Sequence, residues 1–297
     1  MDRITSMSEH PRALIALVLA GSTWGLTLPL SAVALRGASP AWLVSMRFGC
    51  AALVLGVIAG RAGLRRACSP RIAMWGVLGY GGVVLLQSEA LQRTSVSHAA
   101  VLGGTVPLLL VLIAIARGLG RPTGFAAVGL LGAVGGVALF AGGGGQASLA
   151  GDGVVLLASV GSAIYIDAQP ALLAGRSAVA VTAVQMGAAS LAALPLALLG
   201  GPALRLHAHP LLALLALVLV GSLLPFTLYA WSQTRVPREI AGAFLNLEAL
   251  VGAVIGMLAF HNPLGLKQAS GMALLVAGLV LVTVSTPRFA KRARDPA

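Results

Sequence analysis

Charge is scarce in this sequence. Asp, Glu, Lys and Arg make up only 9% of its 297 residues, whereas about a quarter of the residues of a typical soluble domain are charged. So few charges cannot cover the surface of a water-soluble protein of this length, and we expect most of the surface to face lipid. Between residues 13 and 284 no polar stretch is long enough to form a soluble domain.

The sequence also lacks the patterns of nucleotide-binding and metal-dependent proteins. The glycine run 142–145 is not followed by the lysine of a phosphate-binding loop, and we expect it to be a flexible linker between two halves. His207 and His209 have no carboxylate near them, and Cys50 and Cys68 match no metal or redox spacing. We therefore predict no cofactor, no metal site and no enzyme activity.

The net charge of +12 raises the question of nucleic-acid binding, because basic patches neutralise phosphates. The arginines, however, stand singly or in small groups between apolar stretches. No aromatic residues are interleaved with them to stack on bases. We expect no nucleic-acid partner and interpret the arginines as signals of membrane orientation.

Hydrophobic residues, by contrast, make up 58% of the sequence and occur in stretches separated by Arg, Pro, Gly or His. A helix needs about 20 apolar residues to cross a bilayer. The first stretch is longer than a signal-peptide core and a second follows at once, so we expect an uncleaved first helix. We predict an all-α membrane protein with ten transmembrane helices, near residues 13–35, 40–60, 72–92, 96–116, 123–142, 151–172, 177–199, 208–232, 237–260 and 266–286.

Lys and Arg are distributed unevenly between the two sides of this arrangement. Of the 20 Lys and Arg residues, 15 fall on the side of the amino terminus and 4 on the opposite side, with Arg47 inside a predicted helix. Cytoplasmic loops carry an excess of Lys and Arg. We therefore expect both termini in the cytoplasm, in a bacterial-type inner (plasma) membrane.

Two segments 140 residues apart share glycine, aromatic and proline residues: 21–25 followed by Pro29, and 161–165 followed by Pro170. With a shift of 142, a second match pairs Gly129 with Gly271 and Gly136 with Gly278. Seven residues are about two helical turns, so each pair forms a notch where a neighbouring backbone can approach.

The matches indicate two halves of five helices, 11–142 and 149–287, followed by a basic cytoplasmic tail at 288–297. Because each half has an odd number of helices, the halves insert in opposite orientations. This arrangement is typical of transporters with inverted repeats.

Several short motifs in the predicted helices are typical of one group of transporters. They are Trp24-Gly25, Arg47-Phe48, Pro107, Leu247-Glu248 and the helices that carry Gly129 and Gly271. With its ten short helices, the chain resembles the drug/metabolite transporter superfamily with tandem EamA-type domains. It is most similar there to bacterial amino-acid exporters of the YddG type. Two departures are Ala249, where the family often has proline, and the absence of the usual Glu after helices 4 and 9.

Two charges lie in the outer parts of predicted helices. Arg47 and Glu89 differ in depth by only about 6 Å at 1.5 Å per residue. One interpretation is that Arg47 pairs with Glu89, or caps a broken helix, and so locks the outer half. The other interpretation is that Arg47 attracts a substrate carboxylate. His98 is expected at the outer surface in contact with solvent, and Asp167 near the inner end as a snorkelling or hinge residue.

Glu248 lies close to the middle of the bilayer, where a carboxyl group is costly unless it has a partner or faces a wet cavity. Either it holds its helix against neighbouring helices, or it lines a cavity and contacts an amino group or carries a proton. Polar and aromatic groups at similar depth complete a candidate substrate cavity: Trp24, Tyr80, Gln87, Gly103, Tyr165, Gln185, Asn246 and Glu248. Prolines inside helices are candidate hinges: Pro29, Pro107 and Pro170.

The resemblance implies a secondary transporter that exports small metabolites, amino acids first, by alternating access through a central cavity. An alternative is an exporter of lipophilic drugs or quaternary cations, with Glu248 as counter-ion and aromatic rings around the cation. A second alternative is a membrane scaffold or lipid-handling protein that transports nothing. The expected partners are the lipid bilayer and the small-molecule substrate, and we expect a monomer.

Overall fold

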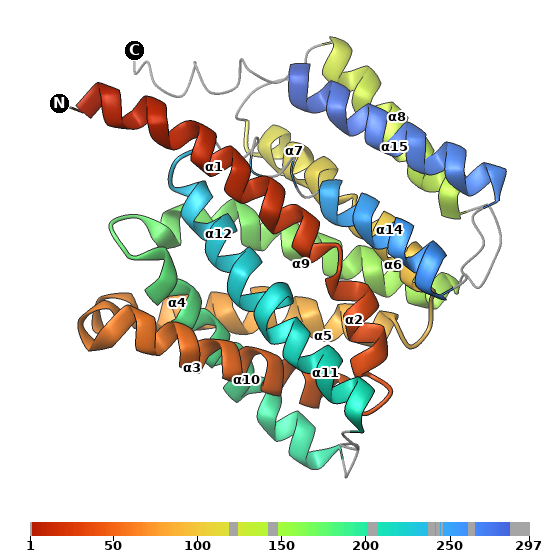
Figure 1. Cartoon of the computed structure of the whole chain (residues 1–297). Coiled ribbons are helices and arrows are strands. Elements are labelled where there is room, and N and C mark those ends of the chain that lie inside the picture. Colours follow the sequence, from red (N-terminus) through yellow and green to blue (C-terminus); the bar gives the residue numbers. More distant parts are fainter. Residues whose placement is uncertain are drawn as a thin grey trace.

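Helices form every regular element in the part of the chain that the structure describes (Figure 1). This computed structural model describes residues 2–118, 124–141, 148–200, 207–236, 241, 244, 246–260 and 265–285. The first half contains α1 (Asp2–Trp24), α2 (Thr27–Ala34), α3 (Pro40–Ala67), α4 (Pro70–Trp75), η1 (Gly76–Gly82), α5 (Val83–Ala90), α6 (Val96–Gly103), α7 (Val106–Ala116) and α8 (Gly124–Ala141). The second half contains α9 (Leu149–Leu173), α10 (Ala178–Leu199), α11 (Ala208–Ala216), η2 (Leu217–Leu223), α12 (Leu224–Gln233), α14 (Asn246–Phe260) and α15 (Leu266–Ser285).

The outer surface of these helices is strongly apolar. Leu53, Val57 and Leu131 are 73%, 84% and 73% exposed, which a water-soluble protein would avoid over so large an area. Helical stretches long and apolar enough to cross a membrane are Pro11–Ala34, Pro40–Ala67, Val96–Ala116, Leu149–Leu173, Ala178–Leu199 and Ala208–Gln233. The chain is a multi-pass membrane protein, as the sequence predicts. The number of ten spans stays a prediction, and the predicted start of helix 9 and the tail 288–297 lie outside the described residues.

Two of the three predicted proline positions coincide with helix breaks. The chain leaves α1 at Gly25 and Leu26, just before Pro29, and it leaves α6 at Gly104 and Thr105, just before Pro107. Pro170 lies three residues before the end of α9 and leaves that helix unbroken. Whether any of these sites moves as a hinge stays a prediction.

Helix α3 is longer than the predicted helix 40–60. Gly60 takes a φ of 67°, which only glycine adopts at little cost, and the chain then continues helically to Ala67. The predicted basic loop 61–71 is therefore largely helical. Arg61, Arg65 and Arg66 remain exposed on this extension.

Two π-helices interrupt the helices at matching places in the two halves. The first, η1, begins at Gly76 between α4 and α5, and the second, η2, begins 141 residues later at Leu217 between α11 and α12. The offset agrees with the shifts of 140 and 142 residues found in the sequence. π-Helices widen a helix locally and are frequent at functional sites.

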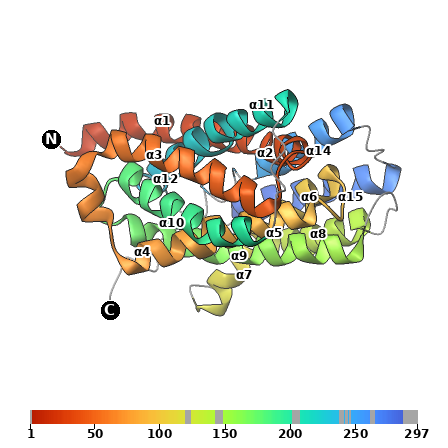
Figure 2. The same ribbon diagram turned by 90° about the horizontal axis from the view of Figure 1, so that it is seen from below.

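Two tightly packed helix pairs form opposite edges of the molecule (Figures 1 and 2). At one edge α8 packs on α15, where a Cβ on Gly271 would lie 2.5 Å from the Phe140 amide nitrogen, and one on Gly278 would lie 2.5 Å from the Gly129 carbonyl oxygen. The predicted close approach at the glycine notches is confirmed. At the other edge α3 packs on α10, where Ser45 and Ser190 donate hydrogen bonds to each other's carbonyl oxygens over 3.2 and 2.8 Å.

Candidate functional site in the central cavity

Between the two edge pairs lies a cavity of about 90 Å³. A water molecule needs about 10–15 Å³ by this measure, so the cavity has room for several waters or a small organic group. Both halves contribute to its wall: the first half through α1, α2, α3, η1, α5, α6 and α7, and the second half through α9, α12 and α14. The lining residues are Trp24, Thr27, Arg47, Gly79, Tyr80, Val83, Val84, Gln87, Gly103, Val106, Ser162, Tyr165, Ile166, Gln169, Phe226, Tyr229, Ala230, Gln233 and Glu248.

Most of the residues predicted for the substrate cavity line this space. They are Trp24, Tyr80, Gln87, Gly103, Tyr165 and Glu248. Gln185 instead lies one layer behind the wall, and the side chain of Asn246 lies outside the described residues.

Aromatic rings form one continuous part of the wall. The Trp24 ring lies 4.8 Å from Phe226 and 4.9 Å from Tyr229, centroid to centroid, with both contacts edge to face. Tyr80 continues the cluster, 4.5 Å from Phe226 and 5.2 Å from Tyr165. Such pairs stabilise beyond their buried area by about 0.5–1.5 kcal/mol each, so the rings hold one another in place.

A buried amide pair fixes the position of Tyr165. Its hydroxyl donates to Gln185 Oε1 over 3.0 Å, and Gln185 and Gln169 exchange hydrogen bonds over 3.0 and 3.2 Å. Gly79 makes room for the Tyr165 ring, which would collide with any side chain there. The network gives the amides of Gln185 and Gln169 hydrogen-bond partners inside the protein, where lipid would offer none.

Arg47 does not form the predicted pair with Glu89. Its Nε donates to Ser222 Oγ over 2.6 Å and its Nη2 to the Gly221 carbonyl oxygen over 2.7 Å. Glu89, near the end of α5, pairs over 3.4 Å with Arg93 in the turn that follows this helix. The depth match failed because it ignored direction: Arg47 points into the molecule and is 1% exposed.

A missing backbone donor explains why Arg47 binds Gly221. In an α-helix the Gly221 carbonyl would accept from residue 225, but Pro225 has no N–H. Arg47 supplies that hydrogen bond from α3, at the point where η2 passes into α12. The sequence-based alternative was that Arg47 caps a broken helix; the carbonyl that it caps lies instead in a helix that continues to Gln233. Because Arg47 also lines the cavity, the interpretation as a carboxylate-binding group is compatible with its position.

Several buried polar atoms in the cavity wall have no hydrogen-bond partner among the described residues. They are Thr27 Oγ1, Arg47 Nη1, Tyr229 Oη, Gln233 Nε2 and Gln233 Oε1. Buried polar groups are nearly always hydrogen-bonded in native proteins. These atoms therefore indicate that water or a polar ligand occupies the cavity in the functioning protein.

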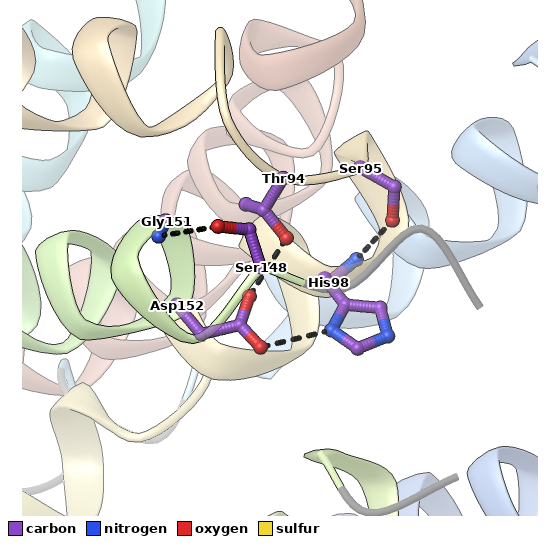
Figure 3. Close-up of polar contacts among 6 residues, drawn as sticks. All are labelled: Thr94, Ser95, His98, Ser148, Gly151 and Asp152. Carbon is purple, nitrogen blue, oxygen red and sulfur yellow. Dashed lines mark hydrogen bonds and ion pairs between the residues drawn. The ribbon is translucent and has the colours of Figure 1, made fainter. Parts of the chain in front are cut away.

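At one end of the molecule, a buried polar cluster joins α6 to α9 (Figure 3). Thr94 Oγ1 donates to Asp152 Oδ1 over 2.7 Å, and His98 Nδ1 lies 3.3 Å from Asp152 Oδ2. His98 is 3% exposed, so the prediction of a solvated histidine is wrong. Its helix begins at Ser95, whose hydroxyl accepts from the His98 amide, and the first turn faces α9 instead of solvent.

An ion pair joins the same two parts of the chain at the opposite end. Arg117, which follows α7, donates to Asp167 of α9. Asp167 is therefore an ion-pair residue, not a snorkelling one. Together with the Asp152 cluster, this pair links the first half to the second at both ends of α9.

Comparison with known proteins gives the family. Residues 11–142 and 149–284 each match the EamA-like transporter family. The chain belongs to this family. It is 30% identical over 298 residues to a protein of Streptantibioticus cattleyicolor named a probable terminal-alkyne amino-acid exporter, covering 96% of this chain and 98% of that one. A solved crystal structure of another protein, 20% identical, superposes with a TM-score of 0.71 over 96% of this chain and 100% of that chain, which supports the fold.

As an EamA-like transporter, the chain is a membrane transporter of small molecules, and the family's members are not enzymes. Phe226, Tyr229 and Gln233 are among the cavity residues of this transporter that were not predicted. All three are in α12, where the sequence placed them near the inner end of a helix, a depth at which aromatic rings collect at the membrane interface. Pro225, which leaves the carbonyl of Gly221 without its α-helical donor, was the available signal for a special position in this helix.

Proposed function

We propose that this EamA-like transporter exports amino acids through the central cavity by alternating access. One observation carries the proposal: Arg47 and Glu248 line the same cavity with opposite charges. An amino acid at neutral pH carries a carboxylate and an ammonium group, so it can satisfy both. The carboxylate would accept from Arg47 Nη1, which has no partner among the described residues, and the ammonium group would donate to Glu248.

The remaining wall favours an apolar or aromatic amino-acid side chain. Trp24, Tyr80, Phe226 and Tyr229 form a ring cluster, and Val83, Val84, Val106 and Ile166 add aliphatic surface. The name of the Streptantibioticus relative also supports an amino acid as the substrate class.

The alternative of an exporter of drugs or quaternary cations fits this cavity less well. Such a site needs an acid without a compensating cation, whereas the Arg47 guanidinium lies in the same wall as Glu248. A cation would therefore meet repulsion from Arg47 as well as attraction to Glu248.

Purified protein in liposomes loaded with a labelled amino acid provides the test. We expect efflux of apolar amino acids such as leucine and phenylalanine, with competition by other zwitterions but not by tetraethylammonium. The carboxamide leucinamide, which lacks the carboxylate, should compete at least about tenfold more weakly, since hydrogen bonds to charged groups contribute about 1.5–3 kcal/mol. If tetraethylammonium and leucinamide compete but zwitterions do not, the result would favour the cation exporter. If no solute leaves the liposomes, the result would favour a scaffold.

We further propose that ten helices span an inner membrane as two inverted repeats, with both termini in the cytoplasm and the monomer as the functional unit. The distribution of 15 and 4 basic residues supports the orientation, and a cavity walled by one chain supports the monomer. After replacement of Cys50 and Cys68, a single cysteine at Ser39 should react with an impermeant thiol reagent in intact spheroplasts, and one at Ala297 should not. The reverse pattern would contradict the orientation.

A further inference from the structure

A second cavity lies at the end of the molecule where the α9–α10 turn and the end of α12 meet. This inner cleft has a volume of about 920 Å³. Figure 1 shows this turn and the end of α12 at the same end of the molecule as the start of α1. By the proposed orientation the cleft opens to the cytoplasm. Its wall consists of Pro170, Leu173, Ala174, Gly175, Arg176, Ser177, Ala178, Val179, Thr227, Leu228, Trp231, Gln233, Thr234 and Arg235.

The wall of the inner cleft is positively charged. Among the residues that the structure describes, it contains Arg176 and Arg235 and no acidic residue. The amino-terminal end of α10 adds a partial positive charge, since Ser177 caps that helix and Ala178 and Val179 line the cleft. A cleft with one sign of charge raises the local concentration of ligands of the opposite sign.

Both arginines are held in defined positions. Arg176 Nη1 donates to the carbonyl oxygens of Leu172 and Ala174, over 3.3 and 3.4 Å, at the end of α9. The guanidinium carbon of Arg235 lies 4.0 Å from the centroid of the Trp231 ring, a cation–π contact. These contacts hold both guanidinium groups at the mouth of the cleft, where Arg176 is exposed to solvent and Arg235 is half-buried.

Gln233 separates the inner cleft from the central cavity. It lines both spaces, it is 6% exposed, and neither polar atom of its amide has a hydrogen-bond partner among the described residues. Thr227 Oγ1, in the wall of the cleft, is also buried without a partner there. Polar atoms left unpaired along a route into the protein need a ligand or water to satisfy them.

We propose that the inner cleft is a capture site for the carboxylate of the substrate, an assignment that rests on the amino-acid transport proposed above. The carboxylate binds first at Arg176 in the cleft. It then passes the amide of Gln233, which can donate a hydrogen bond to it, and reaches Arg47 in the central cavity. The three groups form a series of donors from the cytoplasmic end to the middle of the membrane.

Transport measured separately from the two sides of the membrane tests the capture site. In liposomes without anionic lipid, Arg176→Gln should raise the KM for leucine about fivefold when leucine is supplied on the side of the cleft. The KM from the opposite side should not change. Arg176→Lys should retain most of the wild-type KM, and Arg66→Gln, an exposed arginine on the same side but outside the cleft, should have no effect.

A second measurement tests the charge of the cleft without measuring transport, through the rate at which a cysteine there reacts with charged reagents. With Cys50 and Cys68 replaced by Ala, Gln233→Cys should react faster with a negatively charged than with a positively charged methanethiosulfonate supplied on the cleft side. Adding Arg176→Gln should reduce that ratio several-fold. A cysteine at 233 that does not react from this side would overturn the proposal.

The remaining outcomes separate the capture site from the proposed function. If wild-type protein transports leucine but Arg176→Gln changes KM equally on both sides or on neither, the capture site is wrong and amino-acid transport stands. If no zwitterion is transported, the proposed function fails and carboxylate capture fails with it, whatever the charge preference at position 233. An effect of Arg176→Gln that appears only in liposomes with phosphatidylglycerol would assign the cleft to a lipid phosphate instead.

Discussion

Replacing Arg47 with Ala should lower leucine transport at least about tenfold and also lower the unfolding temperature. The transport loss follows because a substrate carboxylate would lose a charge-assisted hydrogen bond, which contributes about 1.5–3 kcal/mol. The stability loss follows because the Gly221 carbonyl and the Ser222 hydroxyl lose their donor across the two halves. Transport in liposomes and thermal unfolding in detergent measure the two effects.

Two variants separate the roles of Arg47. Ser222→Ala removes one partner but keeps the charge, so it should lower stability by about 1 kcal/mol with little change in KM. Arg47→Lys keeps the charge but not the geometry of two fixed donors, so it should restore transport only in part. If Arg47→Ala destabilises the protein and leaves the KM for leucine unchanged, the side chain serves only to cap the Gly221 carbonyl where η2 passes into α12.

Replacing Glu248 with Gln should slow leucine export about tenfold while leaving insertion and stability close to wild type. Gln keeps the shape of the side chain and much of its hydrogen bonding, but it removes the negative charge that faces the substrate ammonium group. The charges of Arg47 and Glu248 also act on each other across the cavity. A loss of either one therefore leaves the other without its counter-charge.

Exchange and net flux distinguish two functions of Glu248. If the carboxyl group carries a proton, Glu248→Gln should keep the exchange of labelled for unlabelled leucine and lose the response to an imposed pH gradient. If the group only binds the ammonium, exchange and net flux should fall together. Glu89→Gln is the matched control, because Glu89 is half exposed and pairs with Arg93. Wild-type rates for Glu248→Gln in both assays would show a packing role.

Helix positions were predictable from the sequence because lipid demands long apolar stretches. The glycine contacts between α8 and α15 were predictable for a similar reason, since a spacing of seven residues places Gly271 and Gly278 on one face. The extension of α3 to Ala67 was not predictable from hydropathy, because Arg61, Arg65 and Arg66 lie on its exposed surface. Polar residues that remain outside the apolar layer can still be helical.

The sequence predicted site residues whose place depends only on their depth in the membrane. It missed contacts that depend on the direction in which a side chain points. Trp24, Tyr80, Tyr165 and Glu248 lie in the central parts of the helices predicted from the sequence, and each lines the cavity. Arg47 and Glu89 lie at similar depth, but their helices turn them to different neighbours. Depth follows from position in the sequence, whereas direction depends on helix rotation, which a π-helix such as η2 changes.

The paired π-helices impose a requirement on chain length. A π-helix holds more residues per turn than an α-helix, so the rotation of everything after it depends on the extra residue. Winding the same seven residues of η2 as a regular α-helix would turn α12 by roughly 100° or more, because an α-helix advances about 100° per residue and a π-helix only about 80°. Phe226, Tyr229 and Gln233 would then leave the cavity wall, although the composition of the helix would not change. Removing one residue at the same time would bring α12 back close to its present direction, so the extra residue in η2 and the π winding compensate each other.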